Sequence, residues 1–87
     1  MAQELIYDDT DSGGCFTLTV DGVRVGKATF VRLSENMINL DHTLVLKEHE
    51  GRGYGRLLVD AVLQMAEEKG LIVIPGCSYA RYVMENR

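Results

Sequence analysis

The sequence predicts an α+β domain built on a mixed, mostly antiparallel sheet, with one crossover helix and a short C-terminal helix. Three observations lead to this fold class. Residues 15–33 alternate apolar and polar side chains around Asp21 and Gly22, which is typical of a β-hairpin. Residues 57–69 carry an apolar stripe at helical spacing, and a short apolar run at 71–74 follows them. Because a helix joins two extended segments here, the last strand is expected to run parallel to the strand before the helix.

Local signals set the order of the elements in the first half of the chain. Residues 8–14 predict a loop because they are rich in Asp, Ser and Gly. Strands are expected at 15–20 and 23–33, with a bulge near Gly26 where the apolar phase slips. A turn at 34–36 leads to an extended segment at 37–47, long enough for two strands. Regular alternation puts His42 on the same face as four aliphatic residues: Ile38, Leu40, Leu44 and Leu46.

The second half of the chain predicts a helix, a strand and a short terminal helix. The helical stripe consists of Leu57, Leu58, Ala61, Val62 and Met65, and Gly70 is expected to end the helix as its C′ residue. The run 71–74 is continuously apolar, which predicts a strand buried on both faces. Pro75 and Gly76 end it, and Ser78 is the expected N-cap of the last helix.

Composition narrows the classes of function. A chain of 87 residues forms a single domain, expected here over 1–87. The net charge of −4 argues against a nucleic-acid partner. No apolar run approaches the roughly 20 residues of a membrane span, and the first residues do not resemble a secretory signal, so we expect a cytoplasmic protein with no membrane partner. The two cysteines are expected to be thiols, and the two histidines lack zinc-motif spacing, so we expect no metal.

Three glycines at alternate positions, 51, 53 and 55, stand directly before the helical stripe. The first N–H groups of a helix have no intrahelical partners, and glycine lets the backbone approach a ligand closely, so this pattern favours a phosphate or pyrophosphate site. Arg52 and Arg56 would add charge-assisted hydrogen bonds. The spacing fits neither a P-loop nor the dinucleotide fingerprint. The alternative is a glycine-rich turn that only lets the helix and a strand pack closely.

The wider pattern resembles the GNAT superfamily of acyl-CoA-dependent N-acetyltransferases, over roughly residues 14 to 84. Gly53 and Gly55 fill the small positions of its signature Q/R-x-x-G-x-G/A. The similarity is greatest to a very short, single-domain branch with the motif P-x-C-x-F/Y, which Cys77 and Tyr79 fill. The segments that match, in order, are "HTLV" (42–45), "EGRGYG" (50–55), "LLVDAVLQMAEEKG" (57–70) and "PGCSY" (75–79).

The resemblance implies acetyl-CoA or CoA as the cofactor and places it along the chain. The strand backbone at Leu44 and Val45 would pair with the pantetheine arm. The loop amides would hold the pyrophosphate, over the residues Gly51, Arg52, Gly53, Tyr54, Gly55 and Arg56. Glu50 stands where the family usually has arginine or glutamine. A carboxylate repels phosphate, so we expect weaker or more salt-sensitive binding than in relatives with a base there.

The resemblance brings three candidate catalytic residues close to the thioester. His42 is a candidate general base because an imidazole exchanges its proton near neutral pH. Tyr79 is a candidate proton donor to the leaving sulfur. Cys77 offers a covalent route, since a helix N-terminus favours a thiolate that could accept the acetyl group. Each has a structural alternative: a core histidine, a small buried thiol, and a tyrosine that packs the last helix.

The predicted function is therefore acetyl-CoA-dependent N-acetyl transfer to an amine acceptor, either a small amine or a lysine. The alternative is a non-catalytic module of the same fold that binds CoA or acyl-CoA. A third reading is a structural domain with a glycine turn. The chain is expected to act as a monomer or a weak homodimer.

Overall fold

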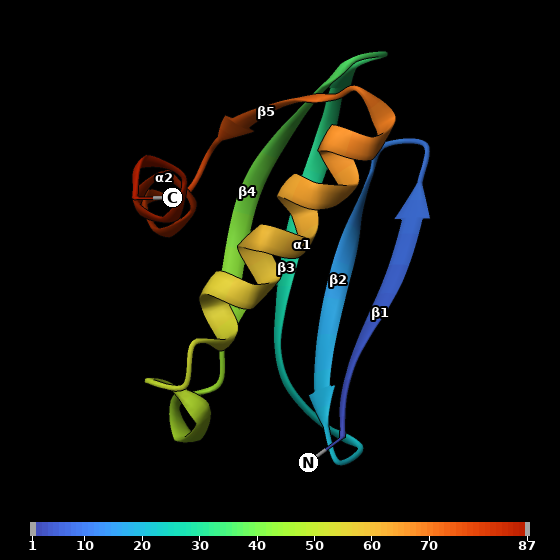
Figure 1. Cartoon of the computed structure of the whole chain (residues 1–87). Coiled ribbons are helices and arrows are strands. Elements are labelled where there is room, and N and C mark those ends of the chain that lie inside the picture. Colours follow the sequence, from blue (N-terminus) through green and yellow to red (C-terminus); the bar gives the residue numbers. More distant parts are fainter. Residues whose placement is uncertain (1, 87) are drawn as a thin grey trace.

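Residues 2–86, the part of the chain that the structure describes, form a five-stranded sheet and two α-helices in this computed structural model (Figure 1). The strands lie in chain order: β1 (Gln3–Thr10), β2 (Gly13–Val20), β3 (Val23–Ser34), β4 (Met37–Val45) and β5 (Ile72–Pro75). The 3-10 turn η1 (Lys47–His49) precedes α1 (Tyr54–Lys69), and α2 (Ser78–Glu85) follows β5. All neighbouring strands are antiparallel except β4 and β5, which are parallel, so the predicted mixed sheet is confirmed.

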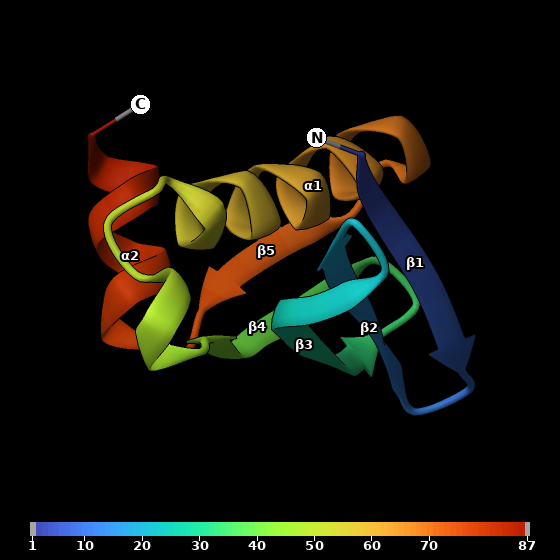
Figure 2. The same ribbon diagram turned by 90° about the horizontal axis from the view of Figure 1, so that it is seen from below.

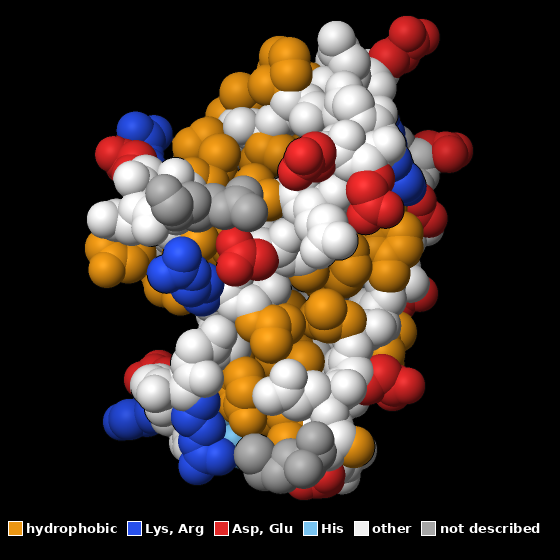
Figure 3. All heavy atoms as spheres, in the orientation of Figure 1, with side chains coloured by type: hydrophobic (Ala, Val, Ile, Leu, Met, Phe, Trp, Pro, Cys, Tyr) orange, Lys and Arg blue, Asp and Glu red, His pale blue; other side chains and the backbone are white. Residues whose placement is uncertain are grey.

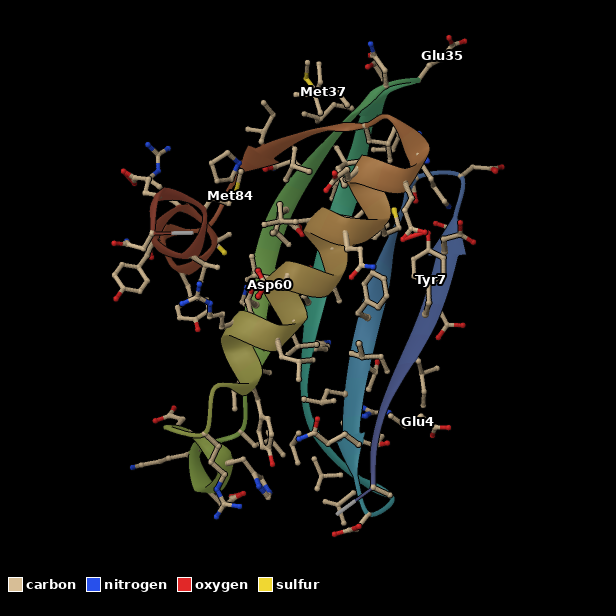
Figure 4. The ribbon with its side chains drawn as sticks, viewed as in Figure 1. Glu4, Tyr7, Glu35, Met37, Asp60 and Met84 are labelled. Carbon is tan, nitrogen blue, oxygen red and sulfur yellow. The ribbon has the colours of Figure 1, made fainter. Side chains whose placement is uncertain are left out.

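The strand β1 is an element that the sequence analysis does not predict. The loop expected at 8–14 is wrong, because 8–10 belong to β1 and Gly13 and Gly14 belong to β2. A Cβ on Gly14 would lie 2.6 Å from Cζ of Phe30, so glycine is needed for that ring to pack across the strand. On β1, the ring of Tyr7 lies 4.9 Å from the ring of Phe16, with Nζ of Lys69 5.4 Å above it (Figure 4). These contacts hold β1 to the sheet.

The first hairpin follows the prediction. Asp21 and Gly22 both have positive φ angles, 52° and 81°, as a tight turn between β2 and β3 requires. The register changes between Leu18, which pairs with Gly26, and Thr19, which pairs with Arg24. The expected bulge near Gly26 is therefore confirmed.

A second bulge lies in β4 and was not predicted. Phe30 pairs with Leu40 and Thr29 pairs with His42, so Asp41 is an extra residue in the strand. The extra residue reverses the alternation, and Thr43 and Val45 face the same side as the buried Leu40. The expectation that His42 and Leu44 share the face of Leu40 is thus wrong: both are exposed on the opposite side of the sheet.

The core lies between one face of the sheet and α1 (Figure 2). The helix begins three residues earlier than predicted, so its buried face starts at Tyr54. Leu58 and Val62 are buried as expected, whereas Leu57, Ala61 and Met65 are only partly buried. The buried residues of α1 are Tyr54, Leu58, Val59, Val62, Leu63 and Ala66. Among the described residues, no helix covers the other face of the sheet, which we call the outer face.

The last two elements differ from the prediction in detail. β5 is an edge strand that pairs only with β4, so Ile72 and Ile74 are exposed and the strand is not buried on both faces. Pro75 ends it, in a position that an edge strand tolerates. The N-cap of α2 is Cys77 rather than Ser78, because the sulfur of Cys77 accepts a hydrogen bond from the N–H of Ala80 at 3.4 Å.

Candidate active site

The site begins where β5 separates from β4. Their pairing ends at Leu40 and Pro75, and the N–H of Gly76 donates to the carbonyl oxygen of Leu40 at 2.9 Å. Residues 42–45 of β4, beyond the bulge at Asp41, pair only with β3. The N–H of Leu46 donates to Val25 on the β3 side at 2.9 Å. Because hydrogen bonding alternates along an antiparallel pair, the backbone groups of Val45 and Thr43 point to the side that β5 has left.

The turn before α1 supplies free N–H groups. Gly51 and Gly53 have φ angles of 80° and 81°, a left-handed conformation that favours glycine. Gly53 is the N-cap of α1 and makes no side-chain capping bond, and the first turn contains no acid. The first N–H with a partner inside the helix is that of Leu57, which donates to Gly53. The three N–H groups before it, at 54–56, are therefore available to an anion.

A tyrosine from α2 closes the site from the other side. A Cβ on Gly55 would lie 2.8 Å from the hydroxyl of Tyr79 and 2.9 Å from two of its ring carbons. Gly55 thus lets the Tyr79 ring lie directly against the first turn of α1. Tyr79 is 40% exposed and is one of the residues that line the cavity.

These three elements enclose a cavity of about 480 Å³. This volume falls in the range of roughly 300–1,000 Å³ that is typical of small-molecule sites. Figure 3 shows the hollow as a notch between α2 and the turn before α1. The lining residues are Thr43, Leu44, Val45, His49, Glu50, Gly51, Gly53, Tyr54, Gly55 and Tyr79.

Cys77 lies next to this cavity without lining it. Its sulfur is 3.8 Å from the hydroxyl oxygen of Thr43, which does line the cavity. The same sulfur caps α2 through Ala80. Cys77 is partly buried, so the thiol holds a structural position at the border of the site.

The structure brings most of the predicted cofactor residues together. Seven of the predicted site residues line the cavity: Leu44, Val45, Gly51, Gly53, Tyr54, Gly55 and Tyr79. Arg52 is exposed outside the lining. The Nε atom of Arg56 lies 3.9 Å from Oδ2 of Asp60, one turn further along α1 (Figure 4 labels Asp60). Both side chains of this ion pair are exposed. Such surface pairs contribute little to stability. Neither arginine is among the residues that line the cavity in this arrangement.

His42 is the predicted catalytic residue that the structure separates from the others. The bulge at Asp41 turns it to the outer face, and it does not line the cavity. Three residues outside the predicted set do line it: Thr43, which the same bulge turns inward, the half-buried His49 of η1, and Glu50. The position of Thr43 at the cavity depends on the register of β3 against β4, and the sequence does not show this register.

No group of three or more His, Cys, Asp or Glu side chains within residues 2–86 lies close enough together to hold a metal ion. None of the helices described there has both the length and the apolar character needed to cross a membrane.

Residues 15–87 match the model of the GCN5-related N-acetyl-transferase family. The match covers most of the chain, and the chain belongs to this family. The matched region begins at residue 15, so β1 lies outside the match.

Solved structures of acetyltransferases share the fold. A GCN5-like putative N-acetyltransferase from Staphylococcus aureus is 30% identical, with a TM-score of 0.69 over 94% of this chain and 79% of its own. A ribosomal-protein-alanine N-acetyltransferase from Brucella melitensis biovar Abortus 2308 is 25% identical, with a TM-score of 0.69 over 88% and 62%. A GNAT family acetyltransferase from Elizabethkingia anophelis with acetyl-CoA bound is 15% identical and shows the fold alone, with a TM-score of 0.67 over 86% and 52%. The chain spans less than two thirds of the length of the last two proteins.

Proposed function

We propose that this chain transfers an acetyl group from acetyl-CoA to an amine acceptor, either a small amine or a lysine side chain. The observation that carries the proposal is the cavity bounded by the unpaired half of β4, the glycine turn before α1 and Tyr79. Membership of the GCN5-related N-acetyltransferase family supports it. So does the acetyl-CoA bound to a protein of the same fold from Elizabethkingia anophelis.

The cavity residues fit acetyl-CoA in two places. The pyrophosphate would accept hydrogen bonds from the N–H groups at 54–56, where Gly51 and Gly53 leave the approach open. The pantetheine arm contains amides and would add to β4 like a strand, using the backbone of Thr43 and Val45. Leu44 lines the same cavity. Arg52 and Arg56 supply positive charge at the rim, while Glu50 in the lining opposes it, so binding should weaken with salt.

The proposed chemistry needs two proton transfers. The bound cofactor supplies a thioester, and the acceptor nitrogen forms a C–N bond with its carbonyl carbon as the C–S bond breaks. The hydroxyl of Tyr79, a residue that lines the cavity, donates a proton to the departing sulfur. A backbone N–H of β4 near Val45 that the pantetheine arm leaves free donates to the carbonyl oxygen as charge develops there. His42 serves as the base for an acceptor that approaches from the outer face.

Cys77 gives the proposal a second route. Its thiolate would form a C–S bond with the carbonyl carbon while the bond to the CoA sulfur breaks, and the acceptor nitrogen would then take the acetyl group. The Thr43 hydroxyl, 3.8 Å away, can hydrogen-bond to that sulfur. A Cys77→Ala variant separates the routes: full activity excludes the covalent route, and loss of activity with CoA binding intact favours it.

The first experiment is a backbone-amide NMR titration with CoA, using ATP and NAD as controls. The proposal expects shifts centred on Val45 and the residues 51–56, followed by acetyl-CoA turnover with at least one amine in a panel. Specific binding without turnover of any amine would favour the non-catalytic CoA-binding module instead. An absence of shifts at millimolar CoA would contradict both.

The Tyr79→Phe variant tests the proton donor. The variant keeps the ring that packs on Gly55 and removes only the hydroxyl. We expect kcat to fall by about 10²-fold, the usual contribution of a general acid, with CoA affinity unchanged. A variant with normal kcat would remove Tyr79 from the mechanism.

A further inference from the structure

Asn39 and Gly76 meet where β4 and β5 separate, a divergence that we call the fork. Asn39 pairs with Ile74 one position before the last paired residues of the two strands. A Cβ on Gly76 would lie 2.8 Å from Cγ and 2.9 Å from Nδ2 of Asn39, and its three nearest atoms all belong to this carboxamide. Gly76 is not among the glycines with positive φ. The Asn39 side chain, rather than the backbone conformation, therefore accounts for glycine at position 76.

The Asn39 carboxamide is costly where it lies. Its Oδ1 is buried, and no hydrogen-bond partner for it is found among the described residues. A buried carbonyl oxygen without a partner destabilises a fold, and an apolar side chain of similar size would avoid that cost. Stability alone therefore does not explain an asparagine here. A buried polar group without a partner at the edge of a site points to a role in that site.

The contact lies where the chain leaves the sheet. The N–H of Gly76 makes the bond to Leu40 that closes the fork, and the next residue is Cys77. Cys77 then contacts Thr43 and caps α2, which carries Tyr79. We propose that Asn39 is a positioning residue that packs against Gly76, sets the width of the fork and thereby places Cys77 and Tyr79 at the cavity. Its importance for catalysis rests on the proposed acetyl transfer, whereas the contact itself can be tested without any activity.

The test is a double-mutant cycle in a Cys15→Ser background, so that Cys77 is the one thiol that reacts. The four proteins carry the wild-type pair, Gly76→Ala, Asn39→Gly, and both substitutions. The first readout is the rate at which iodoacetamide alkylates Cys77, with circular dichroism as a check of folding. The second is CoA affinity from amide NMR shifts, and the third, where turnover exists, is the division of the effect between kcat and KM.

Gly76→Ala alone is expected to change the alkylation rate of Cys77 by at least about threefold, since neighbouring residues in contact couple strongly. Asn39→Gly in the same protein should return the rate to within about twofold of the wild-type pair, because the added methyl group then has room. In the turnover assay, kcat should follow the alkylation rate while KM changes less. If Gly76→Ala prevents folding, recovery of the folded state in the double variant supports the proposal equally.

Two results would overturn it. One is an unchanged alkylation rate in Gly76→Ala, and the other is a double variant no closer to the wild-type pair than Gly76→Ala is, whether in rate or in folding. Failure of the wild-type pair to bind CoA would refute the proposed function instead. The alkylation rates would still decide the role of the Asn39–Gly76 contact in that case.

Discussion

The two halves of β4 have different roles: the first half packs in the core, and the second half lines the cavity. Residues 37–40 are paired on both sides, by β3 and β5, and Ile38 and Leu40 are completely buried. Residues 42–45 are paired only by β3 and line the cavity through Thr43, Leu44 and Val45. The bulge at Asp41 separates the halves.

The difference shows how one strand of a small domain can contribute to both the core and a binding site. The first half contributes apolar burial, and the second contributes unpaired backbone groups that only a ligand or water can satisfy. Stability and binding should therefore respond separately to changes in the two halves. The predictions below test this separation, in order of decreasing expected effect.

The largest effect is expected in the first half, for Leu40→Ala. Leu40 is completely buried, so the free energy of unfolding should fall by about 2–5 kcal/mol through lost burial and a cavity. Leu44→Ala, at a side chain that is 43% exposed, is the matched control and should cost less than about 1 kcal/mol. Urea unfolding followed by circular dichroism measures both. Equal costs would show that the halves do not differ in packing.

In the second half, proline substitutions distinguish the two edges of the strand. The N–H of Leu44 points to β3 by the alternation described above, so Leu44→Pro should cost roughly 2–4 kcal/mol. The N–H of Val45 points to the cavity, so Val45→Pro should cost less stability. The same variant should weaken CoA binding roughly three- to tenfold, the value of one hydrogen bond. A Val45→Pro protein with wild-type CoA affinity would argue against strand-like binding of the pantetheine arm.

A pair of glycines with the same backbone geometry, one far from the cavity and one in the turn before α1, can distinguish an effect on stability from an effect on CoA binding. Gly22 and Gly53 both have φ of 81°, and nothing lies within 4 Å of an added Cβ at either. Alanine at each position should cost about 1–2 kcal/mol through the left-handed conformation. Only Gly53→Ala should also reduce CoA affinity, because Gly53 lines the cavity. Equal CoA affinity in the two variants, measured by titration calorimetry, would count against an anion site there.

The smallest effect is expected for the cap of α2. Cys77→Ala removes the acceptor of the Ala80 N–H and should lower stability by about 1 kcal/mol or less. Cys77→Ser keeps a capping oxygen and should match or exceed the wild-type protein. Thermal unfolding compares the three proteins. A serine variant as unstable as the alanine variant would show that the sulfur contributes packing rather than a cap.

The parts of the fold that the sequence predicted depend on local signals. Turn chemistry at Asp21 and Gly22 is enough to predict their hairpin. The glycines at 51, 53 and 55 are enough to predict the turn and helix start that line the cavity. The parallel pairing of β4 with β5 followed from the helix between them.

The parts that it missed depend on contacts between distant segments. β1 is held by the packing of Tyr7 on Phe16, which no local pattern reveals. The bulge at Asp41 exists only in the register of β4 against β3, and one extra residue exchanged the faces of His42 and Thr43. Because a regular alternation of apolar and polar side chains predicts no bulge, it puts His42 on the wrong side of the sheet.

The position of β1 at the end of the sheet has a consequence for self-association. One side of this eight-residue strand is unpaired, and every residue in it is exposed. Such an edge can accept a strand from another molecule and start aggregation. Here Glu4, Asp8 and Asp9 put three carboxylates along it, and two copies brought edge to edge would repel each other. The acidity of the first residues thus opposes the edge-to-edge pairing of two copies of the chain.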